Sequence, residues 1–338
     1  MRTPLGWGVI GTGSIAAAFT EAVASSTRAR IVSVAGSSPE KGRAFARHWS
    51  VPHAATSVAE LVRHEAVEAV YVASPHPRHE EHALAAIGAG KAVLCEKPLA
   101  TSSDSAERIV RAAKSAGVFL MEAYMYRCHP LLEHALTLLR SGAIGRIEHV
   151  RAHFGFRVER NLDGRLFNPN LGGGAILDVG GYPVSFARLI AGLAEDAAFA
   201  EPVELSAQGR LGPSGVDELA VALLRFPSGV TAELGCATRH ELGTAAAVFG
   251  DRGWLELPNP WIPRGARLGL ESDLIVHRDG HDPEHVVVTT GLPTYAIEAE
   301  LVAETLPALD PRPPAMSSAD TLGNMRVMEA WSRALRSV

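Results

Sequence analysis

Short apolar runs alternate with amphipathic helical patterns over the first third of the chain. Apolar runs with few polar interruptions are typical of strands buried on both faces of a parallel sheet. Ser57 and Thr101 stand where two of the intervening helices would begin, and Gly117 stands where one would end. This alternation predicts a doubly wound α/β sheet. The runs are Trp7 to Ile10, Ala29 to Gly36, Ala66 to Ala73, Ala92 to Cys95 and Val118 to Ala123.

From Tyr124 the pattern changes to longer strands with alternating faces. Turns at Pro227-Ser228-Gly229 and Asp251-Arg252-Gly253 join several of these strands. Two later helices are expected, one from Thr294 through Leu309 and one from Ser317 or Ser318 to Leu335. The pattern predicts an α+β arrangement with a large, mostly antiparallel open sheet. The strands are Ile147 to Arg157, Val203 to Leu211, Glu218 to Phe226, Val230 to Thr238, Ala245 to Phe249 and Trp254 to Leu257.

The first apolar run leads directly into Gly11-Thr12-Gly13-Ser14-Ile15-Ala16, which matches G-x-G-x-x-A between a strand and a helix. The first glycine permits the tight turn, the second lets a pyrophosphate approach the backbone, and the small alanine lets helix and strand pack closely. We therefore predict a Rossmann dinucleotide-binding domain over residues 1–123 and a second domain over 124–338. The residues expected to contact the cofactor here are Gly11, Thr12, Gly13, Ser14 and Ile15.

The residues after the second strand bear on the choice of cofactor. A site that selects NAD usually has Asp or Glu there to bind the ribose 2′-hydroxyl. This chain instead has Ser37 and Ser38, with Lys41 and Arg43 a turn later. Because hydroxyls and cations suit a 2′-phosphate better than a free diol, we expect NADP(H) to be preferred, with NAD(H) possible. Alternatively, Ser38 is only the N-cap of a helix from Pro39 to Trp49, and Lys41 is solvated.

The apolar run that begins at Ala92 ends abruptly in Glu96-Lys97-Pro98. Ligands bind at the carboxyl ends of parallel strands, so Lys97 could reach a reactant from a rigid base. The alternative is a solvated Glu-Lys turn pair. We expect a cis peptide bond between Lys97 and Pro98, because the strand must end while the lysine turns toward the ligand.

The strand before it ends in a loop that should face the same ligand and bind the cofactor, made of Ser74, Pro75, His76 and His79. His79 is expected to cap the helix that follows or to border the nicotinamide pocket. Its spacing of three from His82 does not match the zinc motif of metalloproteases, so no metal site is expected.

A second unusual stretch runs from Gly172 to Pro183. Glycines at 180 and 181 would cost about 1 kcal/mol each inside a helix, and Pro183 removes a hydrogen bond. On a helix, Asp178 and Tyr182 are four residues apart and would be neighbours on one face. The alternative is a flexible glycine loop with an ordinary Asp cap and a core tyrosine.

Composition narrows the classes of partner. The 338 residues carry a net charge of -5 and no long Lys/Arg run, which argues against nucleic acid or an anionic membrane as the main partner. The N-terminal apolar patch is broken by glycines and suits neither a signal peptide nor a spanning helix. Cys95, Cys128 and Cys236 are an odd count without metal spacing, which indicates a reducing cytoplasm. A small-molecule partner is expected.

Taken together, these motifs resemble the glucose-fructose oxidoreductase / inositol dehydrogenase family, Gfo/Idh/MocA. The resemblance covers nearly the whole chain and includes Met121-Glu122-Ala123-Tyr124-Met125-Tyr126-Arg127. Within the family the chain looks most like the dimeric dihydrodiol dehydrogenases and the NADP-dependent aldose (xylose) dehydrogenases. That branch has a tyrosine at the position of Tyr182, and it commonly has an arginine where this chain has Ser37.

The resemblance implies an NAD(P)-dependent oxidoreductase that moves hydride between nicotinamide and a hydroxyl or carbonyl of a sugar, polyol or vicinal diol. Tyr182 would be the acid/base and Lys97 the cation that favours its phenolate, because a free phenol has a pKa near 10. Asp178 would orient substrate hydroxyls or Lys97. Glu96, Lys97 and Arg127 would contact the cofactor, and Arg127, Phe154 and Arg157 would line the substrate side.

Two other functions are compatible with the resemblance. One is a non-catalytic dinucleotide-sensing regulator, which the presence of both Lys97 and Tyr182 disfavours. The other is redox-assisted glycoside cleavage with a tightly bound cofactor. We also expect a homodimer or homotetramer that covers the open face of the second sheet, because a large exposed apolar face usually finds a partner.

Overall fold

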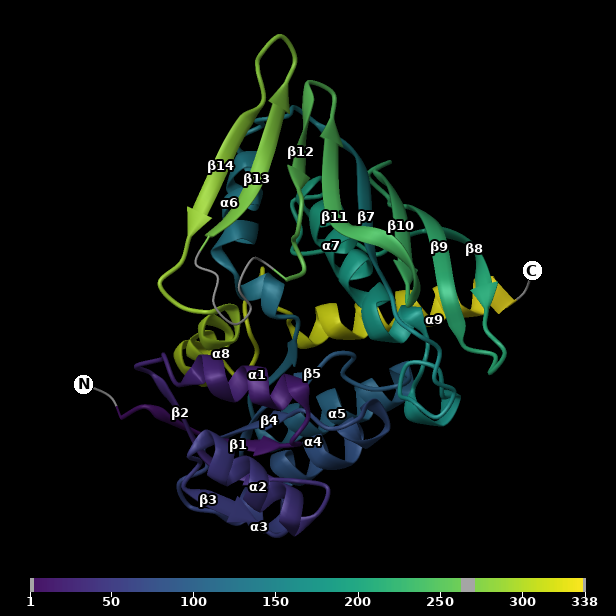
Figure 1. The fold of residues 1–338 in the computed structure, drawn as a ribbon. Helices are drawn as coiled ribbons and strands as arrows, with labels where there is room; N and C mark the ends of the chain where they lie inside the picture. Colours follow the sequence, from purple (N-terminus) through teal and green to yellow (C-terminus); the bar gives the residue numbers. More distant parts are fainter. Residues whose placement is uncertain (1–2, 263–270, 337–338) are drawn as a thin grey trace. The chain divides into compact units, whose positions relative to one another are not determined.

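The computed structural model describes residues 3–262 and 271–336, which divide into two compact units. The first unit contains 3–128 and Thr290–Thr321, and the second contains 129–262, 271–289 and 322–336. The division expected at 123/124 therefore needs a correction, because the chain returns to the first unit at Thr290. Helix α8 (Thr294–Thr305) then packs against α1 (Ser14–Val23), as Figure 1 shows.

The described residues of the first unit form a six-stranded parallel sheet in the order β3-β2-β1-β4-β5-β6. This is the strand order of Rossmann folds, and it confirms the expected fold class. The strands are β1 (Leu5–Ile10), β2 (Ala29–Ala35), β3 (His53–Ala55), β4 (Ala69–Val72), β5 (Ala92–Glu96) and β6 (Leu120–Ala123). The connecting helices are α1, α2 (Pro39–Trp49), α3 (Val58–Arg63), α4 (His79–Gly88) and α5 (Ser103–Ala116). The hydroxyls of Ser38, Ser57 and Ser102 cap α2, α3 and α5.

The described residues of the second unit form an eight-stranded sheet in the order β14-β13-β12-β11-β7-β10-β9-β8. All neighbours in it are antiparallel except β7 and β10. The expected large, mostly antiparallel sheet is thus confirmed. The strands are β7 (Ile147–Arg157), β8 (Glu204–Leu211), β9 (Asp217–Arg225), β10 (Thr231–Ala237), β11 (Arg239–Gly250), β12 (Gly253–Leu257), β13 (Glu271–Arg278) and β14 (Glu284–Thr289).

Helices α6 (Pro130–Arg140), α7 (Gly181–Leu193) and α9 (Ser318–Arg336) cover one face of this sheet (Figure 1). Helix α7 packs on β7 and β10, and Trp331 of α9 donates its indole N–H to the Val221 carbonyl at 3.2 Å. Alternate residues of β7 and β9, such as Val150, Ala152 and Leu224, are buried on this face. The other face remains the more exposed one.

Three details differ from the sequence-based expectation. Strands β13 and β14 were not predicted, and β11 begins at Arg239, well before the expected Ala245. The helix expected through Leu309 ends at Thr305 and continues as a short 3-10 turn. Thr294 is its first residue and not its cap, because the N-cap position belongs to Pro293.

The helical run Pro169–Leu193 is long and apolar enough to cross a membrane by composition alone. Its most apolar window is 89% buried within the structure, as the core helix of a globular domain also is. The run gives only weak evidence for a membrane span.

Candidate active site

The glycine-rich turn after β1 has the geometry that a dinucleotide requires. Gly11 has φ +123, and a Cβ there would lie 2.4 Å from the Ala73 carbonyl oxygen. Gly13 is the N-cap of α1 and supplies no capping side chain, and a Cβ added at Gly13 would meet nothing within 4 Å. The first amides of α1 are therefore approachable by an anion, and Thr12, Ser14 and Ile15 border the same turn. These residues fit a pyrophosphate.

The structure after β2 is compatible with both roles considered for its serines, capping of α2 and binding of a 2′-phosphate. The Ser38 hydroxyl accepts a hydrogen bond from the Lys41 amide at 3.4 Å, so Ser38 does cap α2. Ser37 and the Lys41 side chain are exposed beyond the strand end, whereas Arg43 is paired with Glu40 at 2.8 Å. Ser37 and Lys41 are the groups left to bind a 2′-phosphate.

Lys97 follows the last residue of β5 and is half-buried. The Lys97–Pro98 peptide bond is cis, as expected. Beside it, the buried Glu96 carboxylate accepts a hydrogen bond from the Tyr71 hydroxyl of β4. A rigid strand end therefore carries the lysine.

His79 connects the ends of β4 and β5. It is buried, its Nδ1 lies 2.8 Å from the Pro98 carbonyl oxygen, and its Nε2 lies 2.8 Å from the Ser74 carbonyl oxygen. Burial lowers the pKa of this imidazole, while the two carbonyls raise it. His79 is the first residue of α4, and its side chain holds the two ligand-facing loops together instead of capping the helix. His82 adds a contact of 2.9 Å between its Nδ1 and the Ser74 hydroxyl.

Two buried carboxyl groups that the sequence analysis missed lie near this strand end. Glu122 of β6 accepts the Leu99 amide at 2.8 Å, and burial raises the pKa of its carboxyl to about 7. Burial, and then repulsion from Glu96, raise the pKa of Glu298 of α8 well above its usual range. Because glutamates are almost never fully buried, the sequence pattern gave no signal for either residue.

In the second unit, the glycine-rich stretch forms a π-turn, Ile176–Gly180, that leads directly into α7. π-turns are rare and occur frequently at functional sites. The buried Asp217 of β9 accepts the Ile176 amide at 2.6 Å and so holds the start of this turn. A Cβ at Gly174, where φ is +122, would lie 2.5 Å from an Asp217 carboxylate oxygen. Glycine is thus required for this close approach.

Asp178 and Tyr182 are placed by this turn. The Asp178 carboxylate accepts from Arg165 at 2.6 Å, a partner that the sequence analysis did not identify. The Tyr182 side chain is 4% exposed, with its ring 5.2 Å from Phe154 and 6.0 Å from Trp261. Phe154 thus lies beside Tyr182, and Trp261 adds an aromatic wall that no motif indicated.

Two arginines that were expected to contact the cofactor or the substrate have different partners in the structure. Arg127 is 1% exposed, pairs with Asp320 at 2.8 Å and donates to the Pro314 carbonyl. Its position therefore does not support contact with a ligand, and it anchors the returning segment 290–321 instead. Arg157 lies at the end of β7 in a pocket of other arginines, three residues beyond Phe154.

The remaining expected residues fall into two groups. Ser74, Pro75, His76, His79, Glu96 and Lys97 belong to the first unit, whereas Phe154, Asp178 and Tyr182 belong to the second. Within residues 3–262 and 271–336, no group of three or more His, Cys, Asp or Glu side chains is arranged to hold a metal ion.

The chain is similar in sequence to a family of oxidoreductases. Residues 5–124 match the model of an oxidoreductase family with an NAD-binding Rossmann fold, and residues 132–256 match the GFO/IDH/MocA C-terminal domain. Mouse trans-1,2-dihydrobenzene-1,2-diol dehydrogenase is 36% identical over 261 residues, covering 77% of this chain and 76% of the mouse protein. The Xenopus laevis protein of the same name is 32% identical and covers 93% of each chain.

Solved structures agree in fold over the whole length. The aldose-aldose oxidoreductase from Caulobacter crescentus has a TM-score of 0.87 at 26% identity, covering 99% of this chain and 98% of its own. KijD10, a 3-ketoreductase from Actinomadura kijaniata crystallised with NADP and TDP-benzene, has a TM-score of 0.85 at 26% identity, covering 98% of both chains. The chain belongs to the Gfo/Idh/MocA family and is an NAD(P)-dependent oxidoreductase.

Proposed function

We propose that this oxidoreductase interconverts a hydroxyl and a carbonyl group on a sugar, polyol or vicinal diol, with Lys97 and Tyr182 as its acid/base pair. The observation that carries the proposal is the placement of Lys97. It follows a parallel strand of the dinucleotide-binding unit, and hydrogen bonds hold the two residues after it, Pro98 to His79 and Leu99 to Glu122. Relatives named as diol dehydrogenases and as sugar oxidoreductases support the substrate class.

The cofactor supplies or accepts the hydride, and the protein manages the proton and the charge. Tyr182 would take the proton from the substrate hydroxyl during oxidation and return it during reduction. The Lys97 ammonium would donate a hydrogen bond to the substrate oxygen and stabilise the phenolate. Asp178, already oriented by Arg165, would accept hydrogen bonds from a neighbouring substrate hydroxyl. Phe154 and Trp261 would contact the apolar face of a sugar ring.

We further propose that NADP(H) is preferred over NAD(H). No acidic residue stands directly after β2, where Gly36 and Ser37 follow Ala35. Exposed Ser37 and Lys41 can contact a 2′-phosphate, and the NADP complexes of KijD10 support this choice. We also propose a cytoplasmic location and a homodimer or homotetramer formed through the open face of the second sheet.

The test is a screen of aldoses, inositols and vicinal diols with NADP⁺ and with NAD⁺, followed at the absorbance of the reduced nicotinamide. A stoichiometric increase on adding one substrate class, faster with NADP⁺, is the expected result. Glycoside cleavage without net absorbance change would instead indicate redox-assisted hydrolysis. Cofactor binding without turnover of any class would indicate a regulator.

A further inference from the structure

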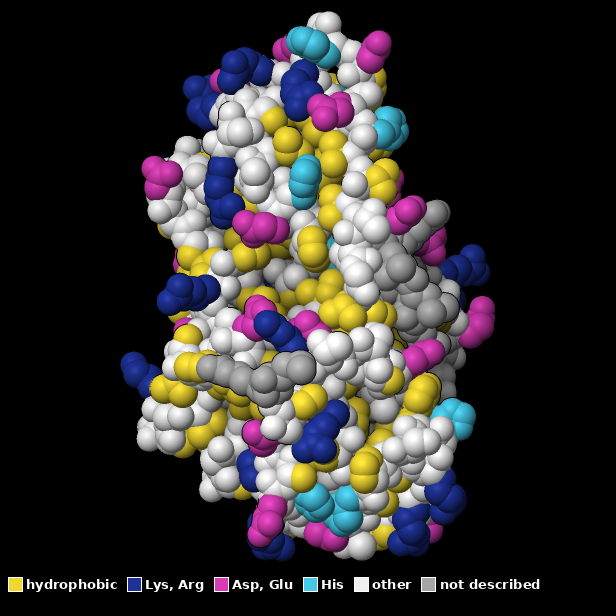
Figure 2. Space-filling view, turned by 90° about the vertical axis from the view of Figure 1, so that its left-hand side faces the viewer, with side chains coloured by type: hydrophobic (Ala, Val, Ile, Leu, Met, Phe, Trp, Pro, Cys, Tyr) yellow, Lys and Arg dark blue, Asp and Glu magenta, His cyan; other side chains and the backbone are white. Residues whose placement is uncertain are grey.

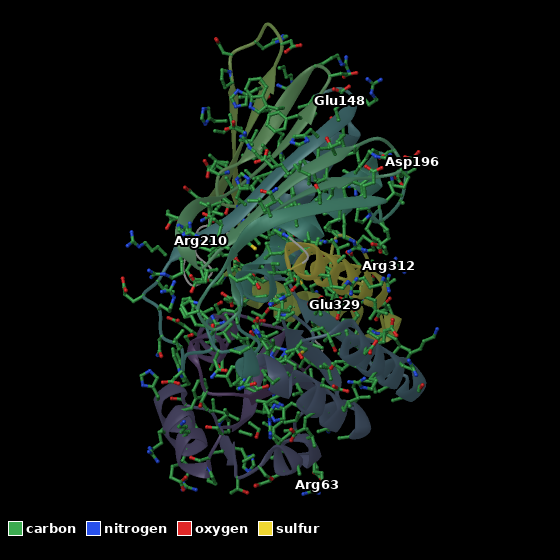
Figure 3. The ribbon with its side chains drawn as sticks, turned by 90° about the vertical axis from the view of Figure 1, so that its right-hand side faces the viewer. Arg63, Glu148, Asp196, Arg210, Arg312 and Glu329 are labelled. Carbon is green, nitrogen blue, oxygen red and sulfur yellow. The ribbon has the colours of Figure 1, made fainter. Side chains whose placement is uncertain are left out.

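A pocket of about 230 Å³ lies at one end of the large sheet, within the second unit. Four segments supply its walls: the end of β7, the end of β8, the start of β9 and the start of β11. Arg210, labelled in Figure 3, comes from β8. The lining residues are Arg157, Arg160, Arg210, Glu218, Arg239 and His240.

A β-bulge shapes this pocket. Strand β11 pairs with β7 at Arg239 and Arg157, and regular pairing resumes only at Gly243 and Gly155. Successive residues of a regular strand point to opposite faces, yet Arg239 and His240 both line the pocket. The bulge makes this possible, and bulges often occur next to binding sites.

The pocket contains more arginine side chains than carboxylates to pair with them. Glu218 is 2% exposed and forms a two-pronged pair with Arg160, with both nitrogen–oxygen distances 2.7 Å. Arg239 donates to the Val158 carbonyl and lies 3.9 Å from the Glu159 carboxylate. Among the described residues, Arg157 and Arg210 have no carboxylate within ion-pair distance. Four guanidinium groups therefore line the pocket beside one lining carboxylate, Glu218, and the second carboxylate nearby, Glu159, is 94% exposed.

This cluster of arginines is a local feature, because the chain as a whole has a net charge of -5. On the face drawn in Figure 2, basic and acidic side chains are interspersed. Guanidinium groups close together repel one another unless an anion lies between them. Their planar forks match the oxygens of phosphate, which can bridge several arginines at once.

We propose that this pocket binds the phosphate group of a small molecule. Its volume lies below the roughly 300–1,000 Å³ of sites for drug-sized ligands. It suits a phosphate or a short phosphate ester better than a dinucleotide, whose glycine-rich turn belongs to the other unit. The phosphate could belong to the substrate itself or to a separate effector.

The pocket is connected to the π-turn by adjacent residues of β9. Glu218 faces the arginines, and Asp217 before it accepts the Ile176 amide at the start of the π-turn that carries Asp178. An anion that competes with Glu218 for Arg160 would change the position of Glu218, and through Asp217 it would affect the π-turn. The effect on turnover rests on the proposed function, whereas binding itself does not.

Binding is tested by calorimetric titration of inorganic phosphate into the NADP-saturated protein at constant ionic strength, so that the cofactor already occupies its own phosphate sites. Wild type should bind at millimolar phosphate or below. Arg210→Gln should weaken binding about tenfold, the usual effect of losing one charge-assisted hydrogen bond. Arg225→Gln removes an equal charge from an exposed position of β9 outside the pocket and should change the affinity less than about twofold.

Kinetics then identify the source of the phosphate. If it belongs to the substrate, a sugar phosphate should have a lower KM than the free sugar in wild type, and Arg210→Gln should remove that advantage. If it is an effector, inorganic phosphate should change kcat/KM for the free sugar in wild type but not in Arg210→Gln. Absence of phosphate binding in wild type, or equal binding in wild type and Arg210→Gln, would overturn the proposal, and neither result depends on turnover.

Discussion

Glu122 is a carboxyl group buried beneath the residues that follow Lys97. Burial raises its pKa to about 7 in the folded protein, against an ordinary value of 4.5, although the nearby Lys97 opposes this shift. The folded state therefore binds more protons than the unfolded state between these pH values. By linkage, this group makes the protein less stable as pH rises from about 4.5 to about 7.

Glu122→Gln should remove this pH dependence, because the amide oxygen can still accept the Leu99 N–H. The unfolding free energy of the variant minus that of wild type should be on the order of 3 kcal/mol larger at pH 8 than at pH 4.5. Urea unfolding at several pH values measures this, and the contribution of other groups such as His129 cancels in the difference. Glu133→Gln, on the exposed side of α6, is the control. An unchanged difference across pH would contradict the assignment.

Ser37 is the residue that decides cofactor choice in our proposal. Ser37→Asp would place a carboxylate where NAD-selective sites have one, attracting the ribose diol and repelling the 2′-phosphate. We expect the ratio of kcat/KM for NADP(H) over NAD(H) to fall at least tenfold, roughly the effect of one charge-assisted hydrogen bond. Ser38→Ala should mainly lower stability, by about 1 kcal/mol, because its hydroxyl caps α2. A larger change in cofactor preference from Ser38→Ala than from Ser37→Asp would reverse the two roles.

At the scale of elements, the π-turn depends on the contact between Gly174 and Asp217. Gly174→Ala introduces a Cβ that would lie 2.5 Å from an Asp217 carboxylate oxygen, at φ +122. We expect a loss of about 2 kcal/mol or more in unfolding free energy and a lower kcat, because the turn also places Asp178. Gly215→Ala is a matched control, with φ +80 and nothing within 4 Å of its added Cβ. Equal effects of the two substitutions would show that backbone strain alone is responsible.

Strong periodicity made many elements predictable from sequence. Helix α2 and strand β7 begin and end where the pattern predicts, because Ser38-Pro39 is a clear start signal and β7 alternates over most of its length. Strands β13 and β14 were missed because neither alternates strictly: β13 buries the polar Ser272, and β14 has three consecutive valines at 286–288. The early start of β11 was missed because residues 239–243 contain a bulge, which breaks the period of two.

The site was only partly predictable. Lys97, Asp178 and Tyr182 stand out because polar groups there interrupt apolar or glycine-rich runs. Arg165 and Trp261 lie in irregular segments, where sequence pattern carries no information on what they contact. The return of residues 290–321 to the first unit was not predictable either, since a helical pattern does not specify the surface on which the helix packs.

At the scale of the whole molecule, the open face of the second sheet is the proposed oligomer interface. Leu223 of β9 is 59% exposed, and its neighbour Val221 is 45% exposed. Leu223→Arg should shift the assembly toward monomers in sedimentation velocity at micromolar concentration, because a symmetric interface would receive the charge twice. Leu162→Arg, at a 48% exposed leucine outside the strands, should leave the assembly unchanged. A monomeric wild type would contradict the proposal.

Lys97 belongs to one unit and Tyr182 to the other, so their proposed action as one acid/base pair concerns the whole molecule. A double-mutant cycle on kcat tests it most directly. Tyr182→Phe keeps the ring and its contacts with Phe154 and Trp261, so a loss of rate reports chemistry and not folding. NADP binding, followed by fluorescence, should survive in all variants.

Tyr182→Phe and Lys97→Met should each lower kcat by roughly 10² to 10⁴, the usual contribution of a positioned acid/base. The pH optimum for oxidation should rise in Lys97→Met, because the phenol loses the cation that favours its ionised form. The double variant should be little slower than either single one, since residues that act as a unit are not additive. Losses that multiply in the double variant, or a Tyr182→Phe enzyme that keeps more than about a third of wild-type kcat, would contradict the pair.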